Sequence, residues 1–533
     1  MKFNATQIPY HATGLFSQLV RDYVEAKQSS LHFVEYAPGI EGVQKAIEAR
    51  KGFKVNRPLL VEVLKAQYTQ LPSTKAVNDN VNALLAENTF VVTTAHQPNI
   101  FTGPLYFFYK IIHAIQICAD LKKRFPENNY VPVYYMGSED ADLDEVGSFY
   151  LGGDKLQWQT KQTGAIGRMK VDDALIGLLK NMEGYWSVKQ QGKHAMEVLG
   201  NAYKKGVTIN EATLNLVHSY FGQYGLVVIQ PDDAKLKSSF VPVMEKELLT
   251  QFSHKALQPT LEKLRAQYHV QTEGRLINLF YLKDNIRARI ELNEGIYTIV
   301  DTNITFTKEE MITELHAHPE RFSPNVILRG VYQETILPGI VFVGGGGELS
   351  YWMELKEVFK EVGVHYPLLQ LRNSFMFINE KMAKQWSDLG FTFSDLFKPS
   401  LDLEVSYVKA NTKNELSLVA SIDAMKGLYN EIQSQAIKVD ATLGDHTMNL
   451  SVQSIKKLME LEKKILKAEK KKQAISLERI QHIKTELFPH NSLQERVDNF
   501  AEWVGDYGWD WVEAVLQNSQ TLDHSFTILV AEH

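Results

Sequence analysis

From about residue 90 onward, short runs of β-branched and aromatic residues alternate with longer amphipathic stretches. This alternation is typical of a mainly parallel sheet covered by helices, because each parallel strand needs a crossover to reach the next one. It predicts an α/β fold with strands at residues 90–94, 131–136, 226–230, 326–329, 340–343 and 367–371, and helices at 104–121, 233–252 and 348–362. Ligands of open sheets bind beyond the carboxyl ends of the strands, so the loops that follow them are the first candidates for a site.

Changes in residue composition and hydrophobic periodicity divide the chain into six expected parts. Between residues 411 and 487 strands vanish, Gly and Pro are scarce, and apolar residues recur at spacings of three and four, which predicts an antiparallel helical arm with a reversal near 442–444. An arm of this kind buries its seam against a partner, so we expect a homodimer. The other expected parts are an N-terminal helical region packed on the core at 1–89, the first half of the core at 90–157, an insertion without an assigned task at 158–210, the second half of the core with a glycine-rich loop at 211–410, and a helical tail docked on the core at 488–533.

Charge and composition exclude several classes of protein. The chain has 57 basic and 63 acidic side chains, a formal charge of −6, so no overall positive field attracts nucleic acid or anionic lipid. No apolar stretch is long enough for a membrane-spanning helix. The single cysteine, Cys118, lies among apolar residues and is interpreted as a packed core thiol in a cytoplasmic protein.

The first candidate loop follows the strand at 90–94. It carries Thr94, His96 and Gln97, and Gly103 lies shortly before a helix. Unpaired backbone N–H groups at a helix start, beside donor side chains, suit an anion. An ordinary connection between strand and helix is the other open interpretation. The loop does not carry the G-x-G-x-x-G dinucleotide fingerprint, and the chain has no G-x-x-x-x-G-K-[ST] phosphate loop.

The second candidate loop holds five carboxylates within residues 139–145. Carboxylates this close repel one another, so a cation, an ammonium group or a helix N-terminus must compensate them. Glu139, Asp140 and Asp142 lie nearest the strand end and are the favoured site residues, whereas the last two acids also suit the first turn of a helix. A substrate amine or Mg²⁺ is a candidate cation, but the spacing matches no EF-hand or zinc site, and no metal ligand set is assigned.

The third candidate loop contains Gly344, Gly345, Gly346 and Gly347. Four successive glycines permit unusual torsion angles and close backbone approach, which favours contact with a ligand. Further candidates are Glu348 as an acceptor for an amine or hydroxyl, Tyr351 and Trp352 as pocket walls, and Arg372 as a holder of carboxylate or phosphate. For Trp352 a core position, and for Arg372 an internal salt bridge, remain open.

With these loops, the chain resembles the bacillithiol biosynthesis cysteine-adding enzymes, also described as cysteine ligases. The resemblance covers nearly the whole length in order. It rests on TAHQPNIFTGPLYFFYKII at 94–112, VPVYYMGSEDADLDEV at 131–146, YGLVVIQPDD at 224–233, PERFSPNVILRGVYQETILPGIVFVGGGGELSYWMELKEVF at 319–359, LFPHNSLQERVDNF at 487–500 and YGWD at 507–510.

This resemblance implies a Rossmann-like core with connecting-peptide insertions, a coiled-coil dimerisation arm, and the addition of L-cysteine to the amine of glucosaminyl-malate as the last step of bacillithiol synthesis. The family's T-G-Q-Q falls on residues 94–97 and its E-D-H-D on residues 139–142. This chain departs from the family at Ala95, His96 and Ala141. No role of the missing histidine transfers, and His96 becomes a candidate donor in its place.

Joining an amine to a carboxylate is uphill in water, so the reaction needs an activated acyl group, for which ATP with Mg²⁺ is the candidate source and no tightly bound cofactor is expected. On this hypothesis the first and third loops bind the activating anion, and His96 donates to the developing negative charge. The acidic loop orients the amine or a metal, and Glu348 helps to deprotonate the amine. The alternatives are a nucleotidyltransferase acting on another small molecule and a non-catalytic ligand-binding or assembly protein.

Overall fold

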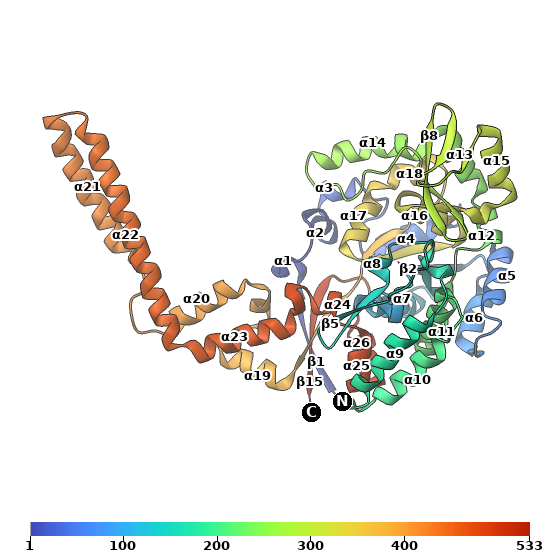
Figure 1. Cartoon of the computed structure of the whole chain (residues 1–533), viewed down its shortest axis with the longest axis horizontal. Coiled ribbons are helices and arrows are strands. Elements are labelled where there is room, and N and C mark those ends of the chain that lie inside the picture. The colour runs from blue at the N-terminus through green and yellow to red at the C-terminus, as the bar shows by residue number, and fades with distance from the viewer. Residues whose placement is uncertain (1, 533) are drawn as a thin grey trace. The chain divides into compact units, whose positions relative to one another are not determined.

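The computed structural model describes residues 2–532, which form two compact units (Figure 1). The core unit contains the chain up to Phe377 and the chain from Ser492 onward. The arm unit is Ile378–Asn491. The core unit is therefore built from two stretches that are far apart in the sequence.

A five-stranded parallel sheet organises the core unit, with the spatial order β13-β12-β2-β3-β6. Its strands are β2 (Thr89–His96), β3 (Asn129–Met136), β6 (Val227–Ile229), β12 (Gly339–Gly344) and β13 (Leu368–Leu371). In chain order this is the 3-2-1-4-5 arrangement of Rossmann-type sheets, whose order reverses between β2 and β12. The predicted α/β class and five of the six predicted strands are confirmed.

The sixth predicted strand, residues 326–329, is wrong. These residues begin helix α16 (Val326–Ile336), because the Asn325 side chain accepts the Ile327 N–H at 2.9 Å and caps the helix. A short apolar run does not distinguish a buried strand from a buried helix turn. The side chains of α16 that pack inward include Ile327, Leu328 and Val331.

Buried apolar runs explain why the sheet lies inside the core unit. All six residues of β12 are buried, as are seven of the eight in β3, which is the pattern of strands covered on both faces. Helix α7 (Tyr106–Arg124) packs on β2 and β3, and α4 (Ile40–Arg50) packs on β12. Cys118 of α7 is buried in the apolar cluster that these helices form with the sheet, as predicted.

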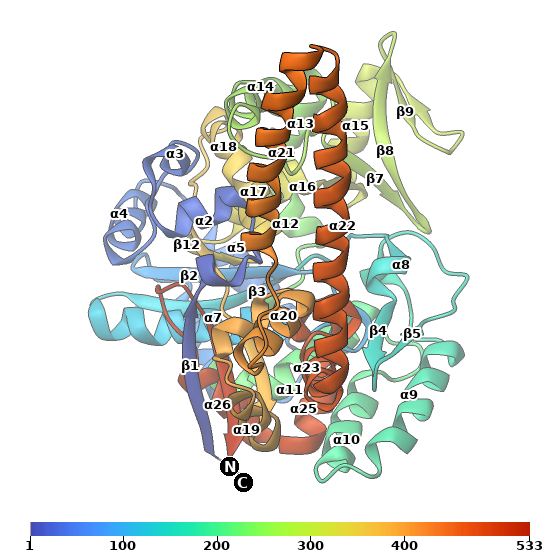
Figure 2. The same cartoon turned by 90° about the vertical axis from the view of Figure 1, so that its left-hand side faces the viewer.

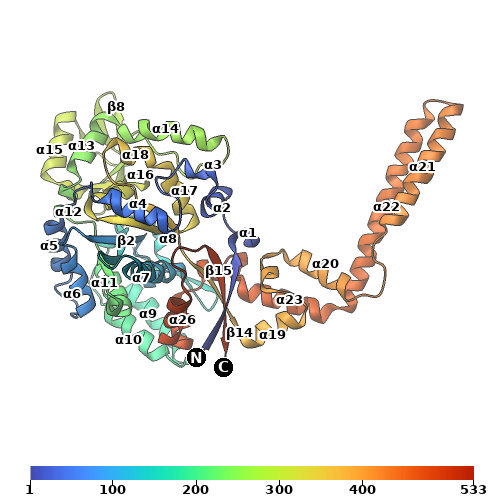
Figure 3. The ribbon, with the colours of Figure 1, turned by 180° about the vertical axis from the view of Figure 1, so that it is seen from behind.

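The two terminal parts of the chain are less helical than predicted. Strand β1 (Lys2–Pro9) pairs antiparallel with β15 (Ser525–Glu532), and the two lie side by side (Figure 3). They join β14 (Ser374–Asn379) in a three-stranded sheet. The helices that follow β1 are α1 (Tyr10–Thr13), α2 (Gln18–Val24), α3 (Gln28–Leu31), α4, α5 (Arg57–Gln67) and α6 (Lys75–Ala83).

A second five-stranded sheet, antiparallel and absent from the predicted elements, lies between β6 and β12 in the chain. Its order is β10-β9-β8-β7-β11. The strands are β7 (Leu279–Lys283), β8 (Ile286–Asn293), β9 (Ile296–Ile299), β10 (Thr305–Phe306) and β11 (Phe322–Pro324). Around it the chain forms α12 (Ala234–Ser238), α13 (Val241–Thr250), α14 (Phe252–Arg265) and α15 (Lys308–Ala317).

The remaining core-unit elements surround the parallel sheet. Between β3 and β6 lie α8 (Leu143–Val146), the hairpin β4 (Ser148–Leu151) and β5 (Asp154–Gln157), and α9 (Asp173–Trp186), α10 (Gly192–Ala202) and α11 (Ile209–Phe221). Helices α17 (Gly346–Glu354) and α18 (Lys356–Glu361) follow β12.

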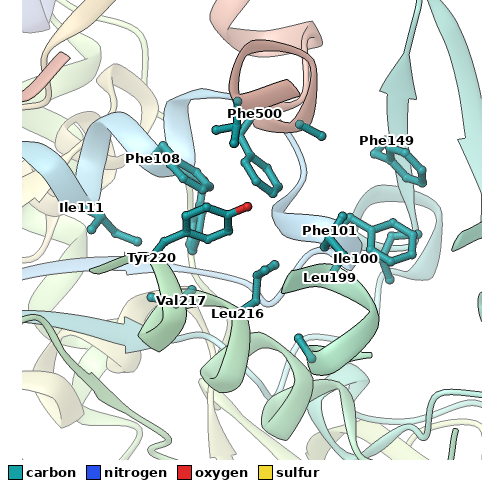
Figure 4. Packing of buried hydrophobic residues seen from close by; sticks show 14 of the residues in the cluster. Ile100, Phe101, Phe108, Ile111, Phe149, Leu199, Leu216, Val217, Tyr220 and Phe500 are labelled. Atoms are coloured by element: carbon teal, nitrogen blue, oxygen red, sulfur yellow. The ribbon is translucent and has the colours of Figure 1, made fainter. Parts of the chain in front are cut away.

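The aromatic residues of the C-terminal part of the chain pack against the core. This part contains α24 (Gln494–Val497), α25 (Phe500–Tyr507) and α26 (Trp509–Asn518). Phe108 stacks on Phe500 with ring centroids 4.5 Å apart, and Tyr220 packs beside them (Figure 4). Trp511 is fully buried in the same cluster.

The arm unit is entirely helical after β14. It contains α19 (Glu380–Asp388), α20 (Ser400–Ala410), α21 (Val419–Val439), α22 (Leu443–Lys472) and α23 (Ala474–Leu487). Helices α21 and α22 lie side by side as an antiparallel hairpin (Figure 2), and Asp440 caps the turn by accepting the Thr442 N–H at 2.8 Å. Within residues 2–532 no helix, α22 included, is long and apolar enough to cross a membrane.

Candidate functional site

A cavity of about 850 Å³ lies at the carboxyl ends of β2 and β12, where the order of the parallel sheet reverses. The loops after β2, β3 and β12 all contribute to it, so the three predicted loops converge. Further lining residues come from residues 272–275, β7, β8 and α16. The predicted site residues that line the cavity are His96, Gln97, Asp140, Gly345, Gly346, Gly347, Glu348, Tyr351 and Arg372, whereas Thr94, Gly103, Glu139, Asp142, Gly344 and Trp352 lie outside its lining.

His96 ends β2 and forms part of the cavity wall. Its ring packs 5.3 Å from the rings of both Tyr106 and Phe107, measured between centroids. Burial lowers the pKa of His96 well below its ordinary value, and the charges of Lys110 and Arg372 lower it further. Nε2 is buried and has no hydrogen-bond partner within residues 2–532. His96 is therefore a neutral imidazole at neutral pH.

Lys110 connects the two turns on either side of the reversal point. Its Nζ donates to the Ala95 carbonyl at 2.9 Å and forms an ion pair with Glu348. Glu348 also accepts the Gly345 N–H at 2.9 Å, which caps α17. Burial lowers the pKa of Lys110, and the Glu348 carboxylate opposes that effect. Because Glu348 is engaged by two donors, the structure gives it a capping and pairing role.

The acidic loop after β3 is split between two environments. Asp140 faces the cavity, accepts from Gln97 Nε2 at 3.1 Å, and lies near two arginines described below. Glu139 is buried and forms an ion pair with Lys237 outside the cavity lining. Asp142 caps α8 by accepting the Glu145 N–H at 3.2 Å. The prediction that all three carboxylates face one site is therefore corrected to Asp140 alone.

The compensating cation that the acidic loop requires comes from the chain itself. Lys237 is 1% exposed and lies between Glu139 and Asp232, with its Nζ 2.9 Å from an Asp232 oxygen. Arg168 holds Asp232 from the other side at 2.6 and 2.7 Å. This buried network fixes the loop directly behind Asp140.

Two glycines of the glycine-rich turn, Gly344 and Gly346, are needed for close packing, and none of the four is needed for an unusual torsion angle. None of its four glycines has a positive φ. A Cβ on Gly344 would lie 2.8 Å from the Phe342 ring, and one on Gly346 would lie 3.0 Å from the Phe16 ring. Gly345, Gly346 and the open position Gly347 line the cavity at the start of α17.

The remaining predicted residues make contacts that hold the fold together. Trp352 is core, stacked on Phe342 at 4.3 Å. Arg372 forms a buried bidentate ion pair with Glu495 at 2.7 and 3.0 Å, which is the internal salt bridge that the sequence left open, and it also lines the cavity. Thr94 donates to the Val343 carbonyl at 2.9 Å and joins β2 to β12. The Gly103 carbonyl accepts from the Asn499 side chain at 2.7 Å.

Comparison with known families agrees with this architecture. Residues 1–373 match the family described as "Bacillithiol biosynthesis BshC, N-terminal Rossmann-like domain", and residues 375–531 match its C-terminal coiled-coil domain. The chain belongs to the BshC family. Curated BshC relatives cover almost its full length.

Two of these BshC relatives come from Flavobacterium johnsoniae, 37% identical over 98% of this chain and 99% of the relative, and Christiangramia forsetii, 37% identical over 98% of each. Both are named "Putative cysteine ligase BshC". A solved structure from Campylobacter jejuni, titled "putative arginyl t-RNA synthetase", aligns over 87% of this chain and 97% of its own length at 11% identity. Its TM-score of 0.22 is too low to indicate a shared fold.

Several cavity residues of this BshC chain escaped the sequence analysis. Lys110 had a usable signal, since it is a lysine inside the apolar helical run YFFYKIIHA. Arg287 and Arg329 had none, because they come from β8 and α16 and reach Asp140 only through the fold. Residues 2–532 contain no group of three or more His, Cys, Asp and Glu side chains placed to hold a metal ion.

Proposed function

We propose that this chain is the cysteine ligase of bacillithiol synthesis, which joins the carboxyl group of L-cysteine to the amine of glucosaminyl-malate through an amide bond. Its membership of the BshC family over nearly the full length supports the pathway. The observation that carries the proposal is the convergence of neutral His96 with the glycine turn of α17 in one cavity at the reversal point of the sheet.

The chemistry requires activation of the cysteine carboxylate before the amine attacks. ATP with Mg²⁺ would supply that activation, with the metal taking most of its ligands from phosphates and water. The donor set fits phosphate oxygens: the N-terminal turn of α17 at Gly346 and Gly347 faces the cavity, and Lys110 and Arg372 lie in the same lining.

In this scheme His96 donates a hydrogen bond to the oxygen on which negative charge develops. A neutral imidazole carries one N–H, so it can donate a hydrogen bond without placing another positive charge beside the nearby cations. Glu348 does not act as the base in this scheme, since its carboxylate is already paired with Lys110 and with the Gly345 amide. Its proposed task is to hold Lys110 beside the activated group. The attacking amine passes its proton to solvent or to the leaving anion.

A reconstituted assay with glucosaminyl-malate, cysteine and ATP, read by product mass spectrometry, tests the function. The product is expected to have the mass of bacillithiol. His96→Ala should lower turnover by about 10²–10³-fold, the usual cost of one such donor. His194→Ala, on the exposed face of α10, is the matched control and should retain full turnover. An active parent enzyme with unchanged His96→Ala turnover would remove His96 from the scheme.

We also propose that a second copy of the chain covers the α21–α22 hairpin. Apolar side chains on both helices remain widely exposed, including Leu428 at 51%, Ile432 at 41%, Val452 at 58% and Met459 at 52%. Monomeric surfaces rarely leave such a row uncovered. We therefore propose that this protein is a cytoplasmic homodimer that acts on small molecules.

A further inference from the structure

Two arginines from separate elements converge on one carboxylate in the cavity wall. Arg287 of β8 places Nη2 3.5 Å from an Asp140 oxygen, and Arg329 of α16 places Nη1 3.6 Å from the other. Both distances exceed the roughly 2.7–2.9 Å of well-formed charge-assisted hydrogen bonds. Asp140 therefore engages both guanidinium groups only loosely.

Arg287 is buried more deeply than its pairing would justify. Its side chain is only 9% exposed, and its guanidinium lies 3.9 Å from the centre of the Phe280 ring. Its Nε is buried and has no hydrogen-bond partner within residues 2–532. A buried charged group with an unused donor is costly unless something else pairs with it. The donor belongs to a residue of the cavity lining.

The charges of the cavity leave an excess at this point. Lys110 is matched by Glu348, and Arg372 is matched by Glu495. Arg287 and Arg329 share Asp140, which also accepts a hydrogen bond from Gln97. Arg329 and Arg287 outweigh the burial of Asp140 and lower the pKa of its carboxyl group. Glu139 also attracts both guanidinium groups, but it is already paired with Lys237, so within residues 2–532 Asp140 is the only carboxylate at ion-pair distance from either arginine.

We propose that Arg287 and Arg329 form an anion subsite that takes the carboxylate or phosphate oxygens of a reactant, and that Asp140 competes with this anion for the same guanidinium groups. The proposal rests on the proposed function only for naming the reactant. Carboxylates would belong to the malate part of the acceptor, and phosphates to the activating nucleotide. The incoming anion would pair with Arg287 Nε and would replace the loose pairing of the two guanidinium groups with Asp140.

Calorimetric titration of the full chain with two separate probes, L-malate and inorganic phosphate, tests the subsite. The probe that binds more tightly names the source of the anion. Arg287→Met, which keeps apolar contact with Phe280, and Arg329→Met should each weaken binding by about tenfold or more. Asp140→Asn removes the competing charge and should tighten binding. If these residues formed only a structural salt bridge, the arginine and the aspartate substitutions would not change the binding affinity in opposite directions.

Arg289→Met is the matched control. Arg289 lies two residues along β8 on the same face, lies 3.8 Å from Glu291 and does not line the cavity, so its loss should leave binding unchanged. If Arg287→Met fails to fold, Arg287→Lys keeps the charge, loses the Nε donor and should still bind more weakly.

Three results would overturn the subsite: neither probe binds the parent chain, either arginine variant that folds binds the tighter probe as well as the parent does, or Asp140→Asn weakens binding. These titrations contain no cysteine or ATP, so they do not depend on amide formation. Arginine-dependent binding in a chain that makes no amide would refute the proposed function and leave the subsite standing.

Discussion

Replacing Lys237 by methionine tests whether the ion network behind Asp140 holds the acidic loop in place. The substitution keeps the apolar stem and removes a charge that is 1% exposed. Asp232 keeps its two hydrogen bonds from Arg168, so the loss falls on Glu139, which has no other ion-pair partner among residues 2–532. Breaking a buried pair in this way typically costs about 3–5 kcal/mol.

The cost should depend on pH with a definite sign. A buried carboxylate that loses its partner avoids isolation by taking up a proton, which becomes harder by about 1.4 kcal/mol for each pH unit above its unfolded titration range. The variant should therefore lose stability as pH rises, and its deficit at pH 7 should exceed that at pH 5 by up to about 2.7 kcal/mol. In the parent chain Glu139 and Asp232 outweigh burial and raise the pKa of Lys237, so this lysine stabilises the fold at both pH values.

Urea unfolding followed by the fluorescence of the buried tryptophans measures both deficits. The double variant Lys237→Met, Glu139→Gln removes the orphaned charge and should recover most of the loss at pH 7. A deficit that is the same at both pH values and is not relieved by Glu139→Gln would refute the reasoning, because it would mean that the network carries no net charge coupling.

Three further predictions concern other parts of the chain. Gly346→Ala should lower the melting temperature, since its Cβ would lie 3.0 Å from the Phe16 ring, whereas Gly347→Ala, which points into open space, should not; equal effects in thermal unfolding would contradict the packing argument. Cys118 should resist thiol reagents until the chain unfolds, because it is 5% exposed and burial raises the pKa of its thiol; rapid labelling of the native chain would disprove this. Leu428→Glu, or deletion of residues 411–472, should give a monomer by light scattering, and an unchanged dimer mass would eliminate the arm as the interface.

Much of the fold follows from local pattern, and the site does so only in part. The strands ending at His96 and Gly344 were predictable because buried parallel strands are continuous apolar runs. Strand β1 was not, since most of its side chains are exposed and carry no alternation. Its pairing with β15 depends on contact between the two ends of the chain.

The acidic loop shows where sequence reasoning stops. Its need for positive charge was predictable from the spacing of its carboxylates. Which carboxylate faces the cavity was not, because Glu139 turns to Lys237 while Asp140 turns to Arg287 and Arg329. No local pattern around 139–142 identifies partners that lie so far along the chain.

The division of the core unit into two stretches has a consequence during synthesis. The Asn499 side chain donates to the Phe101 carbonyl at 2.9 Å across 398 residues, and Phe500 covers Phe108. At ordinary translation rates of about 5–20 residues per second, roughly 20–80 s pass between the appearance of these partners on the ribosome. Throughout that interval the nascent first stretch exposes the aromatic surface that the second stretch later covers. It should therefore depend on chaperones more than a contiguous domain of the same size.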